Sequence, residues 1–131
     1  MKRILIALVV FFFLSNTTHA QFPATSKEVT DILCAAKWKV DSIRVDGKTV
    51  SASEMGLEME IVFRADTTYS MFFQGDTEVG KWTIDLVKKQ VIIFEKDAAA
   101  KSIIVGLAKD RMDMINPEEK EMGAILTPKK D

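Results

Sequence analysis

The chain of 131 residues contains one histidine, His19, and one cysteine, Cys34. His19 falls in an N-terminal segment that we expect to be removed, which would leave no histidine. Hydrolases built on Ser-His-Asp or Cys-His and sites with histidine metal ligands are therefore excluded in their usual forms. One cysteine cannot form an intramolecular disulfide, so the hydrophobic core must hold the fold. We interpret Cys34 as a small apolar residue on a buried helix face, the alternative being a reactive thiol or an intermolecular bridge.

A strong excess of charge of one sign is also missing. The chain has 18 Lys and Arg against 19 Asp and Glu, a formal charge of −1. Loss of Lys2 and Arg3 with the N-terminal segment would lower this charge by two, to −3. The charges are interspersed, so no nucleic acid or anionic lipid surface is expected as a partner. The acidic residues show neither calcium-loop spacing nor a paired inward arrangement. We therefore predict no metal, no cofactor and no enzymatic activity.

The sequence has one long unbroken apolar run, Ile4–Leu14, directly after the basic Lys2 and Arg3. Its eleven residues are too few to span a bilayer. The small residues Thr18 and Ala20 then occupy the −3 and −1 positions of a cleavage site after Ala20. This layout is typical of a secretory signal peptide over residues 1–20. We expect an exported periplasmic or secreted protein without a membrane anchor, with residues 21–131 forming a single domain.

The remaining chain reads as one helix followed by short strands. Thr25 to Glu28 fits a capping box, and apolar residues at helical spacing follow, which predicts about three turns of helix. Alternation of apolar and polar residues then predicts eight strands: 38–45, with a bulge after Val40, 57–64, 69–73, 80–84, 91–94, 101–107, 111–116 and 121–127. Links this short cannot hold crossover helices, so the pattern indicates an antiparallel all-β meander.

Two short motifs fall at informative places in this pattern. Ala36-Lys37-Trp38 opens the first strand, and Gly80-Lys81-Trp82 lies near the middle of the meander. With Asp66-Thr67-Thr68-Tyr69, they make the chain resemble the secreted bacterial lipocalin-like (calycin-like) domains. The family has glycine at Ala36 and inside the Asp66–Tyr69 hairpin. The resemblance implies a small eight-stranded antiparallel up-and-down lipocalin-like barrel with a short N-terminal helix, the Trp38 indole closing one end, and often an internal cavity.

The function that we expect is non-catalytic binding of a small apolar or amphipathic ligand inside this barrel. The residues predicted to face the interior and to contact the ligand are Met59, Tyr69, Met71, Phe73 and Trp82. Because several of these side chains are large, any cavity should be small. The alternative is a protein-interaction or structural module with a filled core that acts through its outer surface. Strands 91–94 and 103–105 are apolar on both faces, so either the helix or a protein partner should cover them.

Overall fold

The computed structural model of the chain describes residues 21–95, 100–119 and 121–129, without the side chains of residues 100 and 101. The predicted signal peptide over residues 1–20 lies outside this part, so its cleavage stays a prediction. Within the described residues, no helix combines the length and the apolar character needed to cross a membrane.

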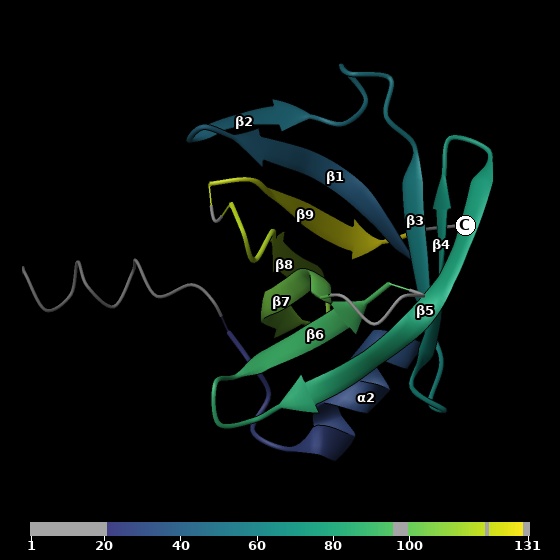
Figure 1. Cartoon of the computed structure of the whole chain (residues 1–131), viewed down its shortest axis with the longest axis vertical. Coiled ribbons are helices and arrows are strands. Elements are labelled where there is room, and N and C mark those ends of the chain that lie inside the picture. The colour runs from purple at the N-terminus through teal and green to yellow at the C-terminus, as the bar shows by residue number, and fades with distance from the viewer. Residues whose placement is uncertain (1–20, 96–99, 120, 130–131) are drawn as a thin grey trace, which may run out of the picture.

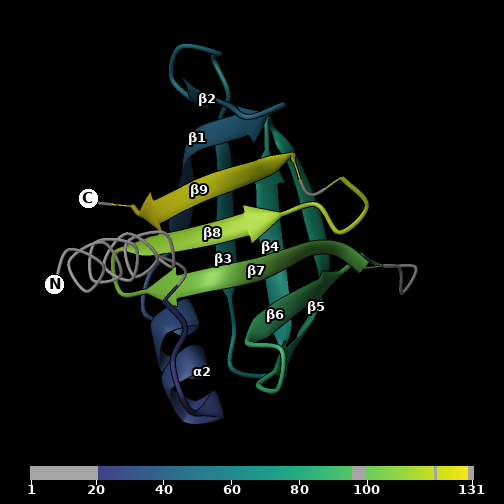
Figure 2. The ribbon, with the colours of Figure 1, turned by 90° about the vertical axis from the view of Figure 1, so that its left-hand side faces the viewer.

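The described chain is one short helix, α2 (Ser26–Cys34), followed by antiparallel strands that close into a barrel (Figures 1 and 2). The strands are β1 (Trp38–Val45), β2 (Lys48–Ser51), β3 (Met59–Phe63), β4 (Thr68–Phe73), β5 (Asp76–Asp85), β6 (Gln90–Phe94), β7 (Ala100–Ala108), β8 (Arg111–Ile115) and β9 (Gly123–Pro128). The barrel closes because β9 pairs with β1 as well as with β8. The predicted eight-stranded antiparallel barrel with an N-terminal helix is therefore confirmed.

Strand β2 is an addition to the eight predicted strands. Strand β1 is shared between two partners, because Trp38 and Lys39 pair with β3 whereas its second half pairs with β2. Asp46 and Gly47 both have positive φ, which forms the two-residue turn that favours a hairpin. The four residues of β2 are exposed or half-buried, so no buried alternation marked them in the sequence. The predicted bulge is present, as the β1–β9 register shifts between Val40 and Ser42.

Helix α2 covers one end of the barrel, below β7 in Figure 2. The helix starts at Thr25, whose side chain accepts a hydrogen bond from the Glu28 amide at 3.2 Å, as a capping box predicts. Val29 and Leu33 on its inner face are fully buried. The Trp38 indole N–H donates to the Leu33 carbonyl oxygen at 3.1 Å, so the tryptophan also satisfies the end of the helix. We call this end, with α2 and Trp38, the closed end.

The structure places Cys34 differently from the sequence interpretation. The residue is exposed at the last position of α2, rather than buried on the inner helix face that Val29 and Leu33 occupy. Desolvation by its surroundings, followed by the charges of Asp31 and Asp66, raises the pKa of its thiol. A raised pKa leaves less of the reactive thiolate at neutral pH. Helix α2 contacts β3, and the turn between β3 and β4 lies near the closed end (Figure 1).

Candidate functional site

Three of the five predicted ligand residues lie in the barrel core. Tyr69 is fully buried, and Met71 and Trp82 are 5% and 3% exposed. Trp82 is fixed from two sides, because its indole N–H donates to the Thr68 carbonyl oxygen at 3.0 Å and its ring meets the Phe63 ring edge-on at 6.2 Å. These residues share the inner face that strand alternation predicted.

The other two predicted residues lie nearer the surface. Met59 is half-buried at the start of β3 and packs against the core. Phe73 is 41% exposed at the end of β4, one residue before the turn at Gln74 and Gly75. The expectation that Phe73 takes up space inside the barrel is therefore wrong, because the last residue of a strand has no neighbour beyond it to complete its burial.

Four hollows on the described part of the chain lie away from the middle of the barrel. None of four hollows found on the described residues is lined by Tyr69, Met71 or Trp82. Met59 lines one of about 580 Å³, next to the connection between β2 and β3. Ligand contact by the five residues stays a prediction, and the largest hollow directs attention to a different place.

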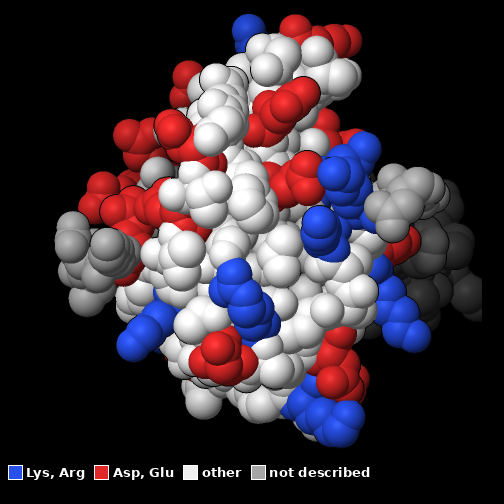
Figure 3. Space-filling model, turned by 90° about the vertical axis from the view of Figure 1, so that its right-hand side faces the viewer, with Lys and Arg blue, Asp and Glu red and all other residues white. Residues whose placement is uncertain are grey.

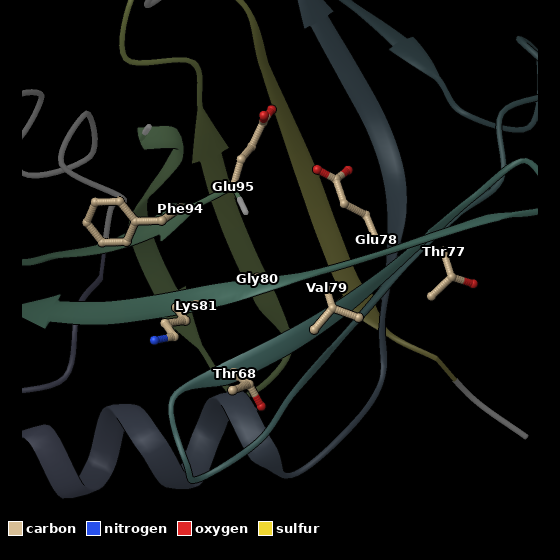
Figure 4. A pocket seen from close by; sticks show the side chains of 8 residues that line it. All are labelled: Thr68, Thr77, Glu78, Val79, Gly80, Lys81, Phe94 and Glu95. Atoms are coloured by element: carbon tan, nitrogen blue, oxygen red, sulfur yellow. The ribbon is translucent and has the colours of Figure 1, made fainter. Parts of the chain in front are cut away.

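This largest hollow has a volume of about 700 Å³ and lies beside the first half of β5 (Figure 4). It forms because the two strands that flank β5 pair with different parts of it. Strand β5 pairs with β4 from Asp76 to Lys81, whereas its pairing with β6 starts only at Lys81. The hollow is lined by Thr68, Thr77, Glu78, Val79, Gly80, Lys81, Phe94 and Glu95. We call this space the β5–β6 hollow, and the end of the barrel toward which it extends, at the turn between β4 and β5, the open end.

Gly80 and Tyr69 pack tightly at the inner side of the β5–β6 hollow. The two residues are partners in the β4–β5 register. A Cβ atom at Gly80 would lie 2.4 Å from the Phe94 carbonyl oxygen and 2.7 Å from the Tyr69 ring. The Tyr69 hydroxyl donates to that same carbonyl oxygen at 3.0 Å. The glycine of Gly80-Lys81-Trp82 is thus required by the close approach of a tyrosine ring and a backbone carbonyl.

Two carboxylates belong to the inner side of the β5–β6 hollow. Glu78 alternates with the buried Gly80 and Trp82 along β5, and Glu95 directly follows β6. Figure 4 shows both side chains on one side of the strands. Burial raises the pKa of Tyr69 to about 12, with smaller contributions from the negative charges of Glu78 and Glu95. At neutral pH the Tyr69 hydroxyl therefore stays protonated and acts as a hydrogen-bond donor.

The opposite, outer side of the hollow carries one exposed apolar residue. Val79 is 52% exposed there, and Thr77 and Lys81 project on the same side as Val79 in Figure 4. Figure 3 shows a broad uncharged surface across this side of the molecule, with Asp and Glu gathered mostly in its upper half, toward the open end. The hollow therefore has the exposed Val79 between Thr77 and Lys81 on its outer side and two carboxylates on its inner side.

Comparisons with known proteins agree with the fold. A crystal structure of a DUF4847 family protein from Bacteroides vulgatus superimposes with a TM-score of 0.61 at 17% sequence identity, covering 79% of this chain and 99% of that chain. An NMR structure of a protein from Bacteroides uniformis gives a TM-score of 0.57 at 20% identity, covering 78% and 93%. No family model matches the sequence, and no curated protein matches it. These similarities show a shared barrel fold alone.

Sequence reasoning missed the two inner carboxylates for different reasons. The alternation of Gly80, Trp82 and Ile84 continues backwards to Glu78, so a longer strand would have placed this glutamate on the inner face. The predicted strand began at Gly80 because Asp76, Thr77 and Glu78 are polar and show no apolar alternation. Glu95 follows a continuous apolar run, which carries no alternation to assign its side.

Proposed function

We propose that this protein binds a small apolar or amphipathic ligand without chemical conversion, outside the cytoplasm, and that the ligand occupies the β5–β6 hollow. The observation that carries the proposal is the hollow itself. Its volume of about 700 Å³ lies within the range of about 300–1,000 Å³ that is usual for ligand sites. Val79 and Phe94 offer apolar contact, and Glu78 with Glu95 offers polar contact on the other side.

The buried tyrosine that packs behind the β5–β6 hollow supports binding rather than catalysis. A general base must be able to accept a proton near neutral pH. Tyr69, whose pKa is raised to about 12, is a donor at that pH and its hydroxyl is already engaged with Phe94. The location outside the cytoplasm rests on the layout of residues 1–20 in the sequence.

A second candidate function is protein interaction through the outer barrel surface. Ile92, Ile103 and Ile115 are paired neighbours on β6, β7 and β8 and face away from the buried Ile93 and Ile104. Helix α2 packs at the closed end through Val29 and Leu33, so this row of isoleucines is left partly exposed. The sequence pattern predicted that either the helix or a protein partner covers these strands. Since the helix leaves the isoleucines partly exposed, a protein partner is the candidate that remains.

The proposal is tested with a neutral apolar fluorophore, N-phenyl-1-naphthylamine, titrated into the purified protein. Val79→Asp places a charge on the apolar side of the hollow and should weaken probe binding at least about fivefold. Val87→Asp is the matched control, because Val87 is 95% exposed in the turn after β5 and does not line the hollow. Equal binding by both variants, or no binding by the unmodified protein, would contradict the proposal.

A further inference from the structure

Gln21 is held against the barrel at the turn between β7 and β8. The Leu107 amide donates a hydrogen bond to the Gln21 carbonyl oxygen at 2.5 Å. Leu107 is only 2% exposed, so this carbonyl oxygen satisfies a backbone donor that lies in the core. Phe22 follows and packs against the core, and residues 21–25 lead from there to α2 (Figure 2). Gln21 and Phe22 are therefore part of the fold.

The remainder of Gln21 lies at the surface. The residue is exposed, and it lines a hollow of about 200 Å³ together with Gly106, Leu107 and Arg111, among others. This hollow offers room beside the barrel for a small ring built on Gln21. The carbonyl group of Gln21 is thus engaged with β7, whereas its side chain has space to change conformation.

The predicted signal peptide ends directly before this residue. Thr18 and Ala20 occupy the −3 and −1 positions of the cleavage site, which places the cut between Ala20 and Gln21. Cleavage there releases the α-amine of Gln21 and makes a glutamine the first residue of the exported chain.

We propose that Gln21 is a modification site, where removal of the signal peptide is followed by cyclisation to pyroglutamate, and that the lactam stays docked beside the β7–β8 turn. The α-amine nitrogen bonds to the side-chain Cδ atom, the bond from Cδ to Nε2 breaks, and ammonia leaves. The reaction needs no oxidant, reductant or second substrate. It rests on the proposed location outside the cytoplasm and is independent of the β5–β6 hollow.

The chemistry of a terminal glutamine favours this reaction. The nucleophile and the electrophile belong to one residue, so their effective concentration is high. An α-amine is partly unprotonated at neutral pH and can therefore attack. Glutamine closes a five-membered ring, which is nearly free of strain. Asparagine, whose side chain is one carbon shorter, would have to close a strained four-membered ring.

Cyclisation also preserves the contact that holds Gln21 in place. The lactam ring contains the nitrogen, the Cα atom and the side-chain carbons, whereas the backbone carbonyl group stays outside it. The hydrogen bond from the Leu107 amide is therefore kept. The lactam removes the free amine that aminopeptidases require. Loss of Gln21 would leave the Leu107 amide without its acceptor and would place a charged amine on Phe22, next to the core.

The modification is tested by intact mass spectrometry of the protein exported by its own host. The expected mass is that of residues 21–131 less one ammonia. N-terminal sequencing should be blocked, and digestion of the denatured protein with pyroglutamyl aminopeptidase should release the block, so that sequencing starts at Phe22. Gln21→Asn is the matched control. It should be cut at the same place and keep a free amine.

The docked position of the first residue is tested by amide hydrogen exchange. The Leu107 amide should exchange equally slowly in the unmutated protein and in Gln21→Asn, because both keep the carbonyl acceptor. Deletion of Gln21 should speed this exchange at least about fivefold. Equal exchange in all three proteins would show that the first residue is not held at the β7–β8 turn.

The remaining outcomes separate this proposal from the proposed function. A free α-amine on Gln21 in the exported protein would overturn the modification and leave the proposed function standing. A first residue other than Gln21 would overturn both the cleavage site and the modification. A chain that retains residues 1–20 would also contradict the location outside the cytoplasm. Naphthylamine binding should be the same in Gln21→Asn as in the unmutated protein, because Gln21 does not line the β5–β6 hollow.

Discussion

The two ends of the barrel use the same kinds of residue for different purposes. At the closed end, Trp38 and Trp82 are almost fully buried, and each indole N–H has a backbone acceptor. At the open end, Phe73 and Val79 are 41% and 52% exposed, and β5 extends past the end of its pairing with β6. One end is therefore closed by α2 and buried aromatic residues, whereas the other presents apolar side chains to the surroundings.

This contrast separates stability from binding along the barrel. Packing at the closed end supplies the buried apolar area that holds a disulfide-free domain together. The open end can then carry exposed apolar residues and two inner carboxylates, because these features add little to stability. Ligand sites are commonly found where a rigid frame leaves such a region incomplete.

The sharpest way to break the contrast is to truncate one aromatic residue at each end. Trp82→Ala should destabilise the protein by about 3–5 kcal/mol, since a large, fully packed side chain is lost. Phe73→Ala should cost less than about 1 kcal/mol, because much of that ring already contacts water. Urea unfolding measures both. Similar losses for the two variants would show that the ends do not differ in packing.

Filling the interior tests where the ligand space lies. Met71→Trp inserts a larger side chain into the core and should cost about 1–3 kcal/mol if the interior is packed. Binding of the naphthylamine probe should remain unchanged, because Met71 does not line the β5–β6 hollow. A variant of unchanged stability that no longer binds the probe would instead place the ligand inside the barrel.

Tyr69 links the core to the open end, and its hydroxyl can be tested by pH. Tyr69→Phe removes the hydrogen bond to the Phe94 carbonyl oxygen and should cost about 0.5–1.5 kcal/mol near neutral pH. The pKa of Tyr69 in the folded state, about 12, lies above the ordinary value of 10.0. Folding therefore favours the protonated form, so this stability is present below pH 10 and is lost as the pH rises toward 12.

Urea unfolding of both proteins at about pH 8 and about pH 11 measures this difference. The advantage of the unmodified protein over Tyr69→Phe should shrink at the higher pH. An advantage that grows with pH would contradict the assigned direction of the pKa shift.

The smallest expected effect concerns the turn at the closed end. Thr67 has a φ of +70°, which a residue with a Cβ atom adopts at a cost. It lies in the hairpin where the lipocalin-like pattern has glycine. Thr67→Gly should therefore stabilise the protein by about 0.5–1 kcal/mol, because relief of this strain exceeds the added freedom of the unfolded chain. Thermal unfolding measures the change, and a loss of stability would show that the Thr67 hydroxyl matters more than its backbone.

The barrel could be predicted from the sequence because its strands have one buried and one exposed face. Val40, Ile61 and Trp82 mark this alternation clearly, and the capping box at Thr25 marks the helix. The candidate site was not predicted, since it arises because β4 and β6 pair with different parts of β5. That difference depends on register, and alternation alone does not fix where pairing between two strands begins.

The central claim is that the ligand binds at the open end, outside the packed interior. It is tested most directly by titrating N-phenyl-1-naphthylamine into isotope-labelled protein and mapping the amide and indole resonances that shift. The claim predicts that the largest shifts fall on Thr77 to Lys81 and on Phe94 and Glu95, while the Trp38 indole stays unchanged. Shifts centred on Trp38, Ile61 and Met71 with an unchanged β5 edge would contradict it.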